Sequence, residues 1–169
     1  MKDNFKLLQN EDVYEICEFL KEINPFVSKK NFKDPYLIKN DFDDTVVKNT
    51  LFSYSRLYFA RVIKNKIQDI CIFECTQYPS TVRSVTLKFS NNINSEGEEL
   101  IRYSLEVIKN LFEEHNKFIV NVRNVNYQNM IDFIEGLKLS REQILINEFG
   151  KNNDLLVYSK LIKEVENEE

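Results

Sequence analysis

Apolar residues recur along the chain with two different spacings, and each spacing predicts a different element. The clearest change of spacing lies in the middle of the chain. Val85, Leu87 and Phe89 alternate with polar residues, which predicts a strand with one buried face. A polar, asparagine-rich turn with Gly97 as its only glycine follows, and helical spacing then predicts a long helix over residues 98–114. A strand, a short turn and a long helix in this order expose backbone N–H groups that can bind an anion.

The same patterns assign elements to the rest of the chain. Strands are predicted over residues 6–8, 56–63, 67–77, 81–89, 118–123, 144–149 and 155–161. Helices are predicted over residues 10–23 (capped by Asn10), 43–54, 98–114 and 126–137, and residues 26–40 are predicted to be an irregular loop. Short turns make the three middle strands an antiparallel meander, and the strand–helix–strand order after them makes part of the sheet parallel. The predicted class is a mixed α/β layer structure.

Length and charge narrow the expected class. The 169 residues, 43% of them hydrophobic, suit one domain over residues 1–162 with an acidic tail over 163–169. The 23 basic and 27 acidic residues give a net charge of −4, and no basic run is longer than Lys29–Lys30, which disfavours nucleic acid as a partner. No apolar run reaches membrane-spanning length, and the N-terminus lacks the apolar core of a signal peptide. We therefore expect a cytoplasmic protein without membrane contact.

The cysteines and the histidine do not suggest a metal site. Cys17, Cys71 and Cys75 are an odd number of thiols, and we interpret them as small core residues. A metal would need further ligands, and His115 is the only histidine. Because His115 ends the predicted long helix, where a cation suits the helix dipole, we interpret it as a helix-end residue rather than a catalytic one.

The order of the elements from residue 5 to residue 161, together with two local patterns, resembles the GNAT superfamily of acyl-CoA-dependent N-acyltransferases. The first pattern is a strand over 85–89 followed by the loop NSEGEE over 94–99, in the place of the family's glycine-rich loop. The second is the segment NYQNMIDFIEGLKL over 126–139, whose apolar spacing fits a late helix of the family. The resemblance implies an α/β fold with a mixed, mostly antiparallel central sheet of 6–7 strands and helices on both faces.

The resemblance also implies acetyl-CoA or another acyl-CoA as co-substrate, with loop N–H groups on the pyrophosphate and an opened strand edge on the pantetheine. The cofactor-binding positions that it assigns are Leu87, Lys88, Phe89, Asn94, Ser95, Glu96, Gly97, Glu98, Glu99, Asn121 and Asn126. In many relatives a late-helix tyrosine protonates the leaving thiolate, but the matching residue here is Ile134. Tyr127, the nearest phenol, is the candidate general acid.

The loop departs from the family pattern in its charge. Glu96, Glu98 and Glu99 stand at the anion-attracting start of the helix, where each repels a pyrophosphate by about 1 kcal/mol in a wet site. The alternative interpretation is an ordinary charged first turn, in which Glu98 and Glu99 pair with Arg102.

Two further polar residues each have two interpretations. Glu74 shares a strand face with Ile70 and Ile72, so it is either a general base acting through a water or an acid at the sheet rim in solvent. Asn121 is an amide within an apolar strand and must find a partner. That partner is either the pantetheine arm or a neighbouring loop.

The leading hypothesis is an N-acyltransferase that moves an acetyl or short acyl group from acyl-CoA to an amine of a small molecule, peptide or protein. The alternative is a catalytically degenerate GNAT-fold binding or interaction module, favoured by the acidic, glycine-poor loop and by Ile134. A third hypothesis is a domain that docks on another protein through an edge strand. We expect a monomer or a homodimer.

Overall fold

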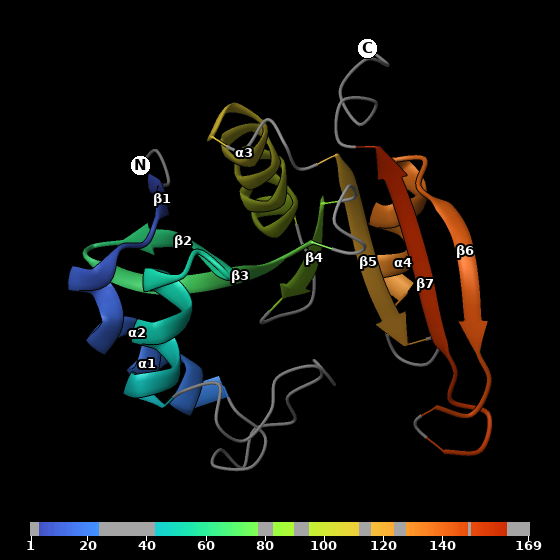
Figure 1. Ribbon diagram of the computed structural model, residues 1–169, viewed down its shortest axis with the longest axis horizontal. Coiled ribbons are helices and arrows are strands. Elements are labelled where there is room, and N and C mark those ends of the chain that lie inside the picture. The colour runs from blue at the N-terminus through green and yellow to red at the C-terminus, as the bar shows by residue number, and fades with distance from the viewer. Residues whose placement is uncertain are drawn as a thin grey trace. The chain divides into compact units, whose positions relative to one another are not determined.

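The computed structural model describes residues 4–23, 43–77, 83–89, 95–111, 116–123, 128–148 and 150–161. By its contacts the chain divides into two compact units, and each has its own helices and strands (Figure 1). The first unit comprises Met1–Cys75 and Lys88–Asn91, and the second comprises Thr76–Leu87 and Asn92–Glu169. The single domain over residues 1–162 stays a prediction, and the tail over 163–169 lies outside the described residues, as does the loop over 26–40.

The first unit contains a three-stranded antiparallel sheet and two helices. Its elements are β1 (Asn4–Leu7), a 3-10 turn (Asn10–Asp12), α1 (Val13–Ile23), α2 (Asp44–Phe52), β2 (Arg56–Ile63) and most of β3 (Lys66–Gln77). β1 and β3 each pair antiparallel with β2. Lys64 and Asn65 connect β2 to β3 with φ of 49° and 60°, the two positive angles of a type I′ hairpin turn.

The β2–β3 pairing shifts by one residue near the turn. Val62 pairs with Ile67 but Arg61 pairs with Asp69, which leaves Gln68 without a partner in the register. This is a β-bulge, in which one strand carries an extra residue. Because of it, Ile67 and Ile70 pack against the same core although their positions differ by three.

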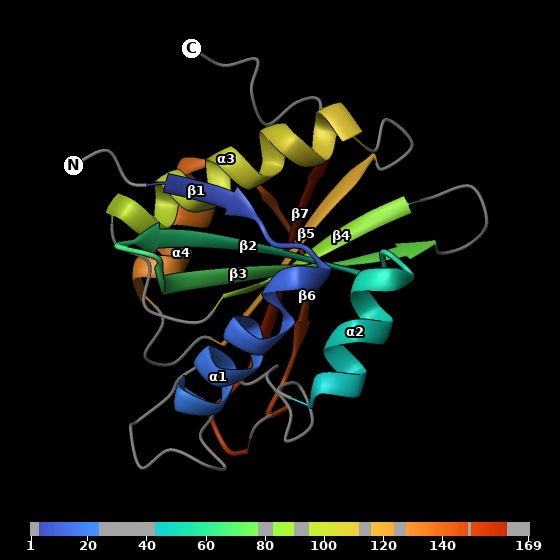
Figure 2. The same ribbon diagram turned by 90° about the vertical axis from the view of Figure 1, so that its left-hand side faces the viewer.

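One face of this sheet is covered by both helices. Figures 1 and 2 show α1 and α2 on the same side of β2 and β3. The buried side chains there are Val13, Ile16, Cys17 and Leu20 of α1, Val47 of α2, and Tyr58, Ala60, Ile70 and Ile72 of the strands. The opposite face is buried as well, and the rings of Phe59 and Phe73 meet edge to face with centroids 5.7 Å apart. Both faces of the strands therefore belong to the core.

The helix starts in this unit follow from local capping. The Asp43 carboxylate accepts hydrogen bonds from the backbone N–H groups of Thr45 (2.9 Å) and Val46 (3.3 Å), which fixes the start of α2. The predicted cap at Asn10 is wrong. A 3-10 turn comes first, and Asp12 accepts a hydrogen bond from the backbone N–H of Gln9 (2.8 Å), one residue before Asn10.

The second unit is a strand–helix–strand crossover followed by a helix and a hairpin. Its elements are β4 (Arg83–Phe89), α3 (Ser95–Leu111), β5 (Lys117–Arg123), α4 (Gln128–Gly136), β6 (Ser140–Leu145) and β7 (Leu155–Leu161). β4 runs parallel to β5, which confirms the predicted parallel part. β7 pairs antiparallel with both β5 and β6, so these strands form a second three-stranded antiparallel group in the order β5-β7-β6.

α4 covers one face of this group. Phe118, Val120 and Val122 of β5 are buried, and Phe118 lies opposite Lys160 in the register. The Lys160 Nζ donates to the Leu137 carbonyl just after α4 (3.4 Å), so α4 lies on the Phe118 side. In Figure 1, α4 is correspondingly seen behind β5 and β7. Lys117, Ile119 and Asn121 point to the opposite face because side chains alternate along a strand.

The predicted mixed, mostly antiparallel α/β class is confirmed, and the predicted single sheet of 6–7 strands stays a prediction. Two elements start three or four residues earlier than predicted. α3 starts at Ser95, three residues before the predicted residue 98, and β6 starts at Ser140, four residues before the predicted residue 144. β6 is exposed along most of its length, so it has no apolar alternation to reveal its start. No helix in the described ranges is long and apolar enough to cross a membrane.

Candidate functional site

The start of α3 is the first part of the candidate site. Because the helix begins at Ser95, Gly97 lies in its first turn and not in a loop before it, which corrects the predicted boundary. The first four N–H groups of a helix have no partner within the helix, and the helix dipole adds positive potential there. Gly97 is buried, whereas Ser95 at the very start is exposed. Helix starts are a common place for anions to bind in proteins.

The acidic residues of this turn do not pair as one interpretation predicted. Glu96 accepts a hydrogen bond from the Ser95 hydroxyl (3.1 Å). Among the described residues, no ion pair joins Arg102 to Glu98 or Glu99. The Arg102 guanidinium lies instead over the Phe133 ring of α4, with its central carbon 5.8 Å from the ring centroid. The predicted Glu98–Arg102 and Glu99–Arg102 pairs are thus wrong.

The second part of the site is the point where the β4–β5 register ends. The parallel pairs run from Ser84 and Lys117 to Leu87 and Val120. β5 continues to Arg123, and its remaining residues pair on their other side with β7. The first residue past the β4 register is therefore Asn121, on the face opposite α4.

The Asn121 side chain lacks a protein partner within the described residues. It is partly buried, and no hydrogen bond joins its amide to another described residue. One of the two interpretations of Asn121 was a contact with a neighbouring loop, and the described residues contain no such contact. An amide has two donors and two acceptor lone pairs, and buried polar groups are normally satisfied. Any protein partner of this amide therefore lies outside the described residues.

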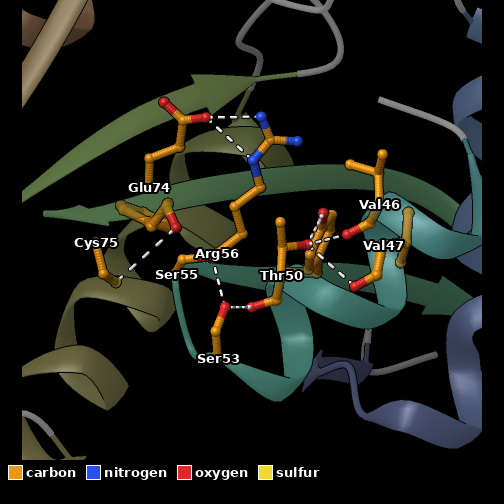
Figure 3. Close-up of polar contacts among 10 residues, drawn as sticks. Val46, Val47, Thr50, Ser53, Ser55, Arg56, Glu74 and Cys75 are labelled. Atoms are coloured by element: carbon orange, nitrogen blue, oxygen red, sulfur yellow. Dashed lines mark hydrogen bonds and ion pairs between the residues drawn. The ribbon is translucent and has the colours of Figure 1, made fainter. Parts of the chain in front are cut away.

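A third polar arrangement involves Glu74 in the first unit. Arg56 and Glu74 lie directly opposite each other on β2 and β3. Glu74 Oε1 accepts from Arg56 Nε (3.0 Å) and lies 2.8 Å from Nη2, as Figure 3 shows. The Arg56 side chain is 12% exposed and the Glu74 side chain is 29% exposed. Glu74 is therefore neither on a purely apolar surface nor at a solvated rim; it is held by a guanidinium.

Hydroxyl groups connect α2 to β2 beside this pair. The Thr50 Oγ1 donates to the Val46 and Val47 carbonyls (Figure 3). It also lies 3.0 Å from the Tyr58 hydroxyl. The Ser53 and Ser55 hydroxyls are 2.9 Å apart at the end of the same helix. These contacts fix the end of α2 against the strand that carries Arg56.

The similarity of this chain to known proteins lies in its structure. No protein-family model matches the chain, and no curated protein matches its sequence. An acetyltransferase of the GNAT family from Streptococcus pneumoniae is similar in structure with a TM-score of 0.69, at 13% identity, over 95% of this chain and 99% of that chain. The chain has the GNAT fold.

Two other solved structures show the same similarity. An aminoglycoside 6'-N-acetyltransferase complexed with coenzyme A has a TM-score of 0.67 and 11% identity, over 94% of this chain and 97% of that chain. The spermidine/spermine N-acetyltransferase from Vibrio cholerae has a TM-score of 0.67 and 15% identity, over 97% of each chain. The sequence-predicted GNAT resemblance is thereby confirmed for the fold.

The structure places some of the positions predicted for a GNAT site and leaves others undescribed. Ser95, Glu96, Gly97, Glu98 and Glu99 are together in the first α3 turn, and Leu87 lies at the end of the β4–β5 register. Lys88 and Phe89 follow in β4 and belong by contacts to the first unit. Asn94, Asn126 and Tyr127 lie outside the described residues, as does His115. Ile134, at the position of the family's tyrosine, is fully buried.

The thiols have no catalytic arrangement in this GNAT fold. Burial, with a contribution from Asp44, raises the pKa of Cys17 to about 12. Burial and the charge of Glu74 raise the pKa of Cys75 to about 12 as well. Both remain protonated at neutral pH and are poor nucleophiles. No group of three potential metal ligands occurs among the described residues.

A polar cluster on the second unit's sheet was not found from the sequence. Glu142 contacts Lys117 Nζ (2.8 Å) and accepts from the Ser159 hydroxyl (2.5 Å), which lowers the pKa of the Glu142 carboxyl, mainly because of Lys117. A register shift between Arg141 and Gln143 accompanies this arrangement. The three residues are far apart in sequence, so only the strand pairing could have revealed them.

Proposed function

We propose that the chain is a GNAT-type N-acyltransferase that moves an acetyl or short acyl group from acyl-CoA to an amine. One observation carries the proposal. The β4–β5 pairing stops at Leu87 and Val120, and the next residue of β5 is Asn121, whose partly buried amide has no partner among the described residues. The same unit contains the start of α3 with its buried Gly97. Known GNAT-fold acetyltransferases, one of them complexed with coenzyme A, support the assignment.

The proposal gives each part of this site a binding role. The first-turn N–H groups of α3 hold the pyrophosphate of the coenzyme, because a helix start is a ready anion site. Asn121 hydrogen-bonds an amide of the pantetheine arm, which supplies both a donor and an acceptor. Lys88, Phe89, Asn94 and Asn126 complete the proposed cofactor contacts. One continuous central sheet of 6–7 strands with helices on both faces is part of the same proposal.

The chemistry proposed is a direct transfer between two bound substrates. The amine nitrogen attacks the thioester carbonyl, a C–N bond forms, and the C–S bond breaks. The amine loses one proton to a base, for which Glu74 acting through a water is the candidate. The departing thiolate gains one proton from an acid, for which Tyr127 is the candidate. Holding both substrates in one orientation supplies much of the rate.

The proposal also covers the acceptor of the acyl group and the location of the enzyme. Solved structures with this fold include enzymes named for aminoglycosides, for spermidine and spermine, and for an alanine of a ribosomal protein. We propose a small-molecule or peptide amine as acceptor for this chain, a cytoplasmic location, and a monomer or homodimer. A net charge of −4 is compatible with a cationic amine.

A second function is favoured by a specific observation. The first α3 turn carries Glu96 and Glu98, and the buried Ile134 has no proton to donate at the position of the family's tyrosine. These features suit a GNAT-fold module that binds a partner without catalysis. Such a module would bind acyl-CoA weakly or not at all.

Calorimetric binding followed by a turnover assay tests the proposal. Saturable binding of acetyl-CoA with Kd below about 100 μM, equivalent to more than ~5 kcal/mol, supports the cofactor site. Release of free coenzyme A thiol in the presence of a panel of amines supports the transferase. Absence of binding at millimolar acetyl-CoA overturns the proposal. Tight binding without thiol release on any amine favours the binding module instead.

A further inference from the structure

Arg102 occupies an unusual position in the second turn of α3. Its side chain is exposed, and its guanidinium lies over the buried Phe133 ring of α4 at 5.8 Å from the ring centroid. This distance is within the range of a cation–π interaction. The contact joins two helices of the second unit, so it fixes the guanidinium in a definite place between them.

Carboxylates on the same helix would be the expected partners of Arg102. Glu98 and Glu99 precede it by four and three residues, and Glu106 follows it by four. Pairs at these spacings are neighbours on a helix surface and normally attract. Within the described part of the chain, none of these acids forms an ion pair with Arg102. The charge of the guanidinium is therefore directed to the ring rather than neutralised by a carboxylate.

A guanidinium on an aromatic face is well suited to bind a phosphate. When a ring lies against the flat face of a guanidinium, the N–H donors point outward in the plane of the group. These donors match two oxygens of a phosphate at once, which a lysine ammonium cannot do in the same way. An arginine that already contacts a ring also loses less conformational freedom when it binds a ligand.

The position of Arg102 along the helix brings this group toward the start of α3. Arg102 is five residues after Gly97, which is about 7.5 Å along a helix axis. Side chains of a helix lean toward its N-terminus and cover the preceding turn. Arg102 therefore lies one turn after Glu98 and Glu99 on the same side of α3, next to the first turn that carries the acids Glu96 and Glu98.

We infer that Arg102 is a specificity-determining residue that binds a phosphate group of the acyl-CoA nucleotide, an inference that rests on the proposed function. Residues 94–99 contain no positively charged side chain, and Arg102 of α3 supplies the positive charge in their place. Phe133 positions the guanidinium for this contact. The ligand chemistry is a phosphomonoester or a pyrophosphate, and the two are separated by the choice of probe.

The test compares Arg102→Gln with a matched control, Lys109→Gln, which removes one exposed positive charge from the last turn of the same helix. Binding of coenzyme A and of 3′-dephospho-coenzyme A is measured by calorimetry on the full chain. Arg102→Gln should weaken coenzyme A binding by about 10-fold or more, as expected for lost hydrogen bonds to a charged group. Lys109→Gln should change it by less than about 2-fold, because surface charges far from the ligand are screened. Arg102→Lys should fall between the two.

Each outcome decides a point. Loss of affinity for coenzyme A alone assigns the contact to the 3′-phosphate, and equal loss for both ligands assigns it to the pyrophosphate. If Arg102→Gln binds both ligands as Lys109→Gln does, with circular dichroism showing both variants folded, this inference is overturned while the cofactor site stands. If the wild-type chain binds neither ligand, the proposed function and this inference fall together.

Discussion

Replacing Glu74 by glutamine measures how much the ion pair with Arg56 contributes to the first unit. Exposed ion pairs contribute about 0.2–1 kcal/mol, whereas removing one partner of a fully buried pair costs about 3–5 kcal/mol. The pair lies between these limits, since Arg56 is 12% and Glu74 29% exposed, and Oε1 receives two guanidinium contacts. We therefore expect Glu74→Gln to lower the free energy of unfolding by roughly 2 kcal/mol, since the amide keeps the shape but loses the charge.

Urea denaturation monitored by circular dichroism measures this loss. For a chain of this length, a change of roughly 2 kcal/mol corresponds to a melting temperature about 4–8 °C lower. The matched control is Glu18→Gln on α1, because the Glu18–Lys21 pair is 52% and 42% exposed. We expect this control to change the free energy of unfolding far less than Glu74→Gln does, because water screens an exposed ion pair. A double-mutant cycle with Arg56→Gln isolates the coupling between the two side chains.

The reasoning would be refuted by a coupling energy no larger than that of the exposed control. In that case the contacts in Figure 3 would not hold the strand ends together. The Glu74→Gln variant also tests the proposed catalytic role of Glu74. If Glu74 accepts the amine proton, Glu74→Gln should lower kcat in the turnover assay at temperatures far below its melting point.

Further expectations concern pH, thiols and the cofactor. Because the pKa of Glu142 is lowered in the folded chain, its contribution to stability is present above its unfolded pKa and is lost as the pH falls through the folded value. We therefore expect the urea unfolding midpoints of wild type and Glu142→Gln, measured between about pH 3 and 7, to converge at the acid end. A difference between the two midpoints that stays constant with pH would contradict this. Native Cys17 and Cys75, with pKa values of about 12, should react with a thiol reagent at pH 8 far more slowly than after unfolding, and equal rates would show that the thiols are accessible and ionised. Asn121→Leu should change stability by less than about 0.5 kcal/mol but weaken acetyl-CoA binding several-fold. Gly97→Val should weaken that binding strongly, because a β-branched side chain narrows the approach to the first turn of α3, and unchanged affinity would move the pyrophosphate site elsewhere.

Sequence periodicity predicted the elements whose apolar residues recur with a regular spacing. The alternation in residues 56–63 and 85–89 predicted the strands β2 and β4, and the apolar stripe of α1 predicted a helix. In β2 the four consecutive residues from Leu57 to Ala60 are buried, so this strand has buried side chains on both faces. β6 was placed too late because four consecutive polar residues, from Ser140 to Gln143, are exposed. The early start of α3 was missed for a related reason, since Ser95 and Glu96 are polar and fall before the first apolar position.

The candidate site was less predictable because its contacts depend on pairing between distant segments. The face of Glu74 follows from its spacing to Ile70 and Ile72, but its partner Arg56 follows only from the strand register. Likewise, local spacing predicted that Arg102 would pair with the neighbouring glutamates. A ring from another helix provides the contact instead, and no local pattern contains that information.

The unmatched Gln68 determines which side of β3 receives the charge of Glu74. If β3 had no extra residue, the register that starts at the two-residue turn would pair Arg56 with Phe73. The Glu74 side chain would then point to the face of the sheet that lies away from the helices. The length of the segment, rather than the identity of its residues, thus sets the position of the carboxylate. Homologous chains that gain or lose one residue between the hairpin turn and Glu74 should carry their acidic residue at the neighbouring position, so an alignment without gaps would compare the wrong side chains.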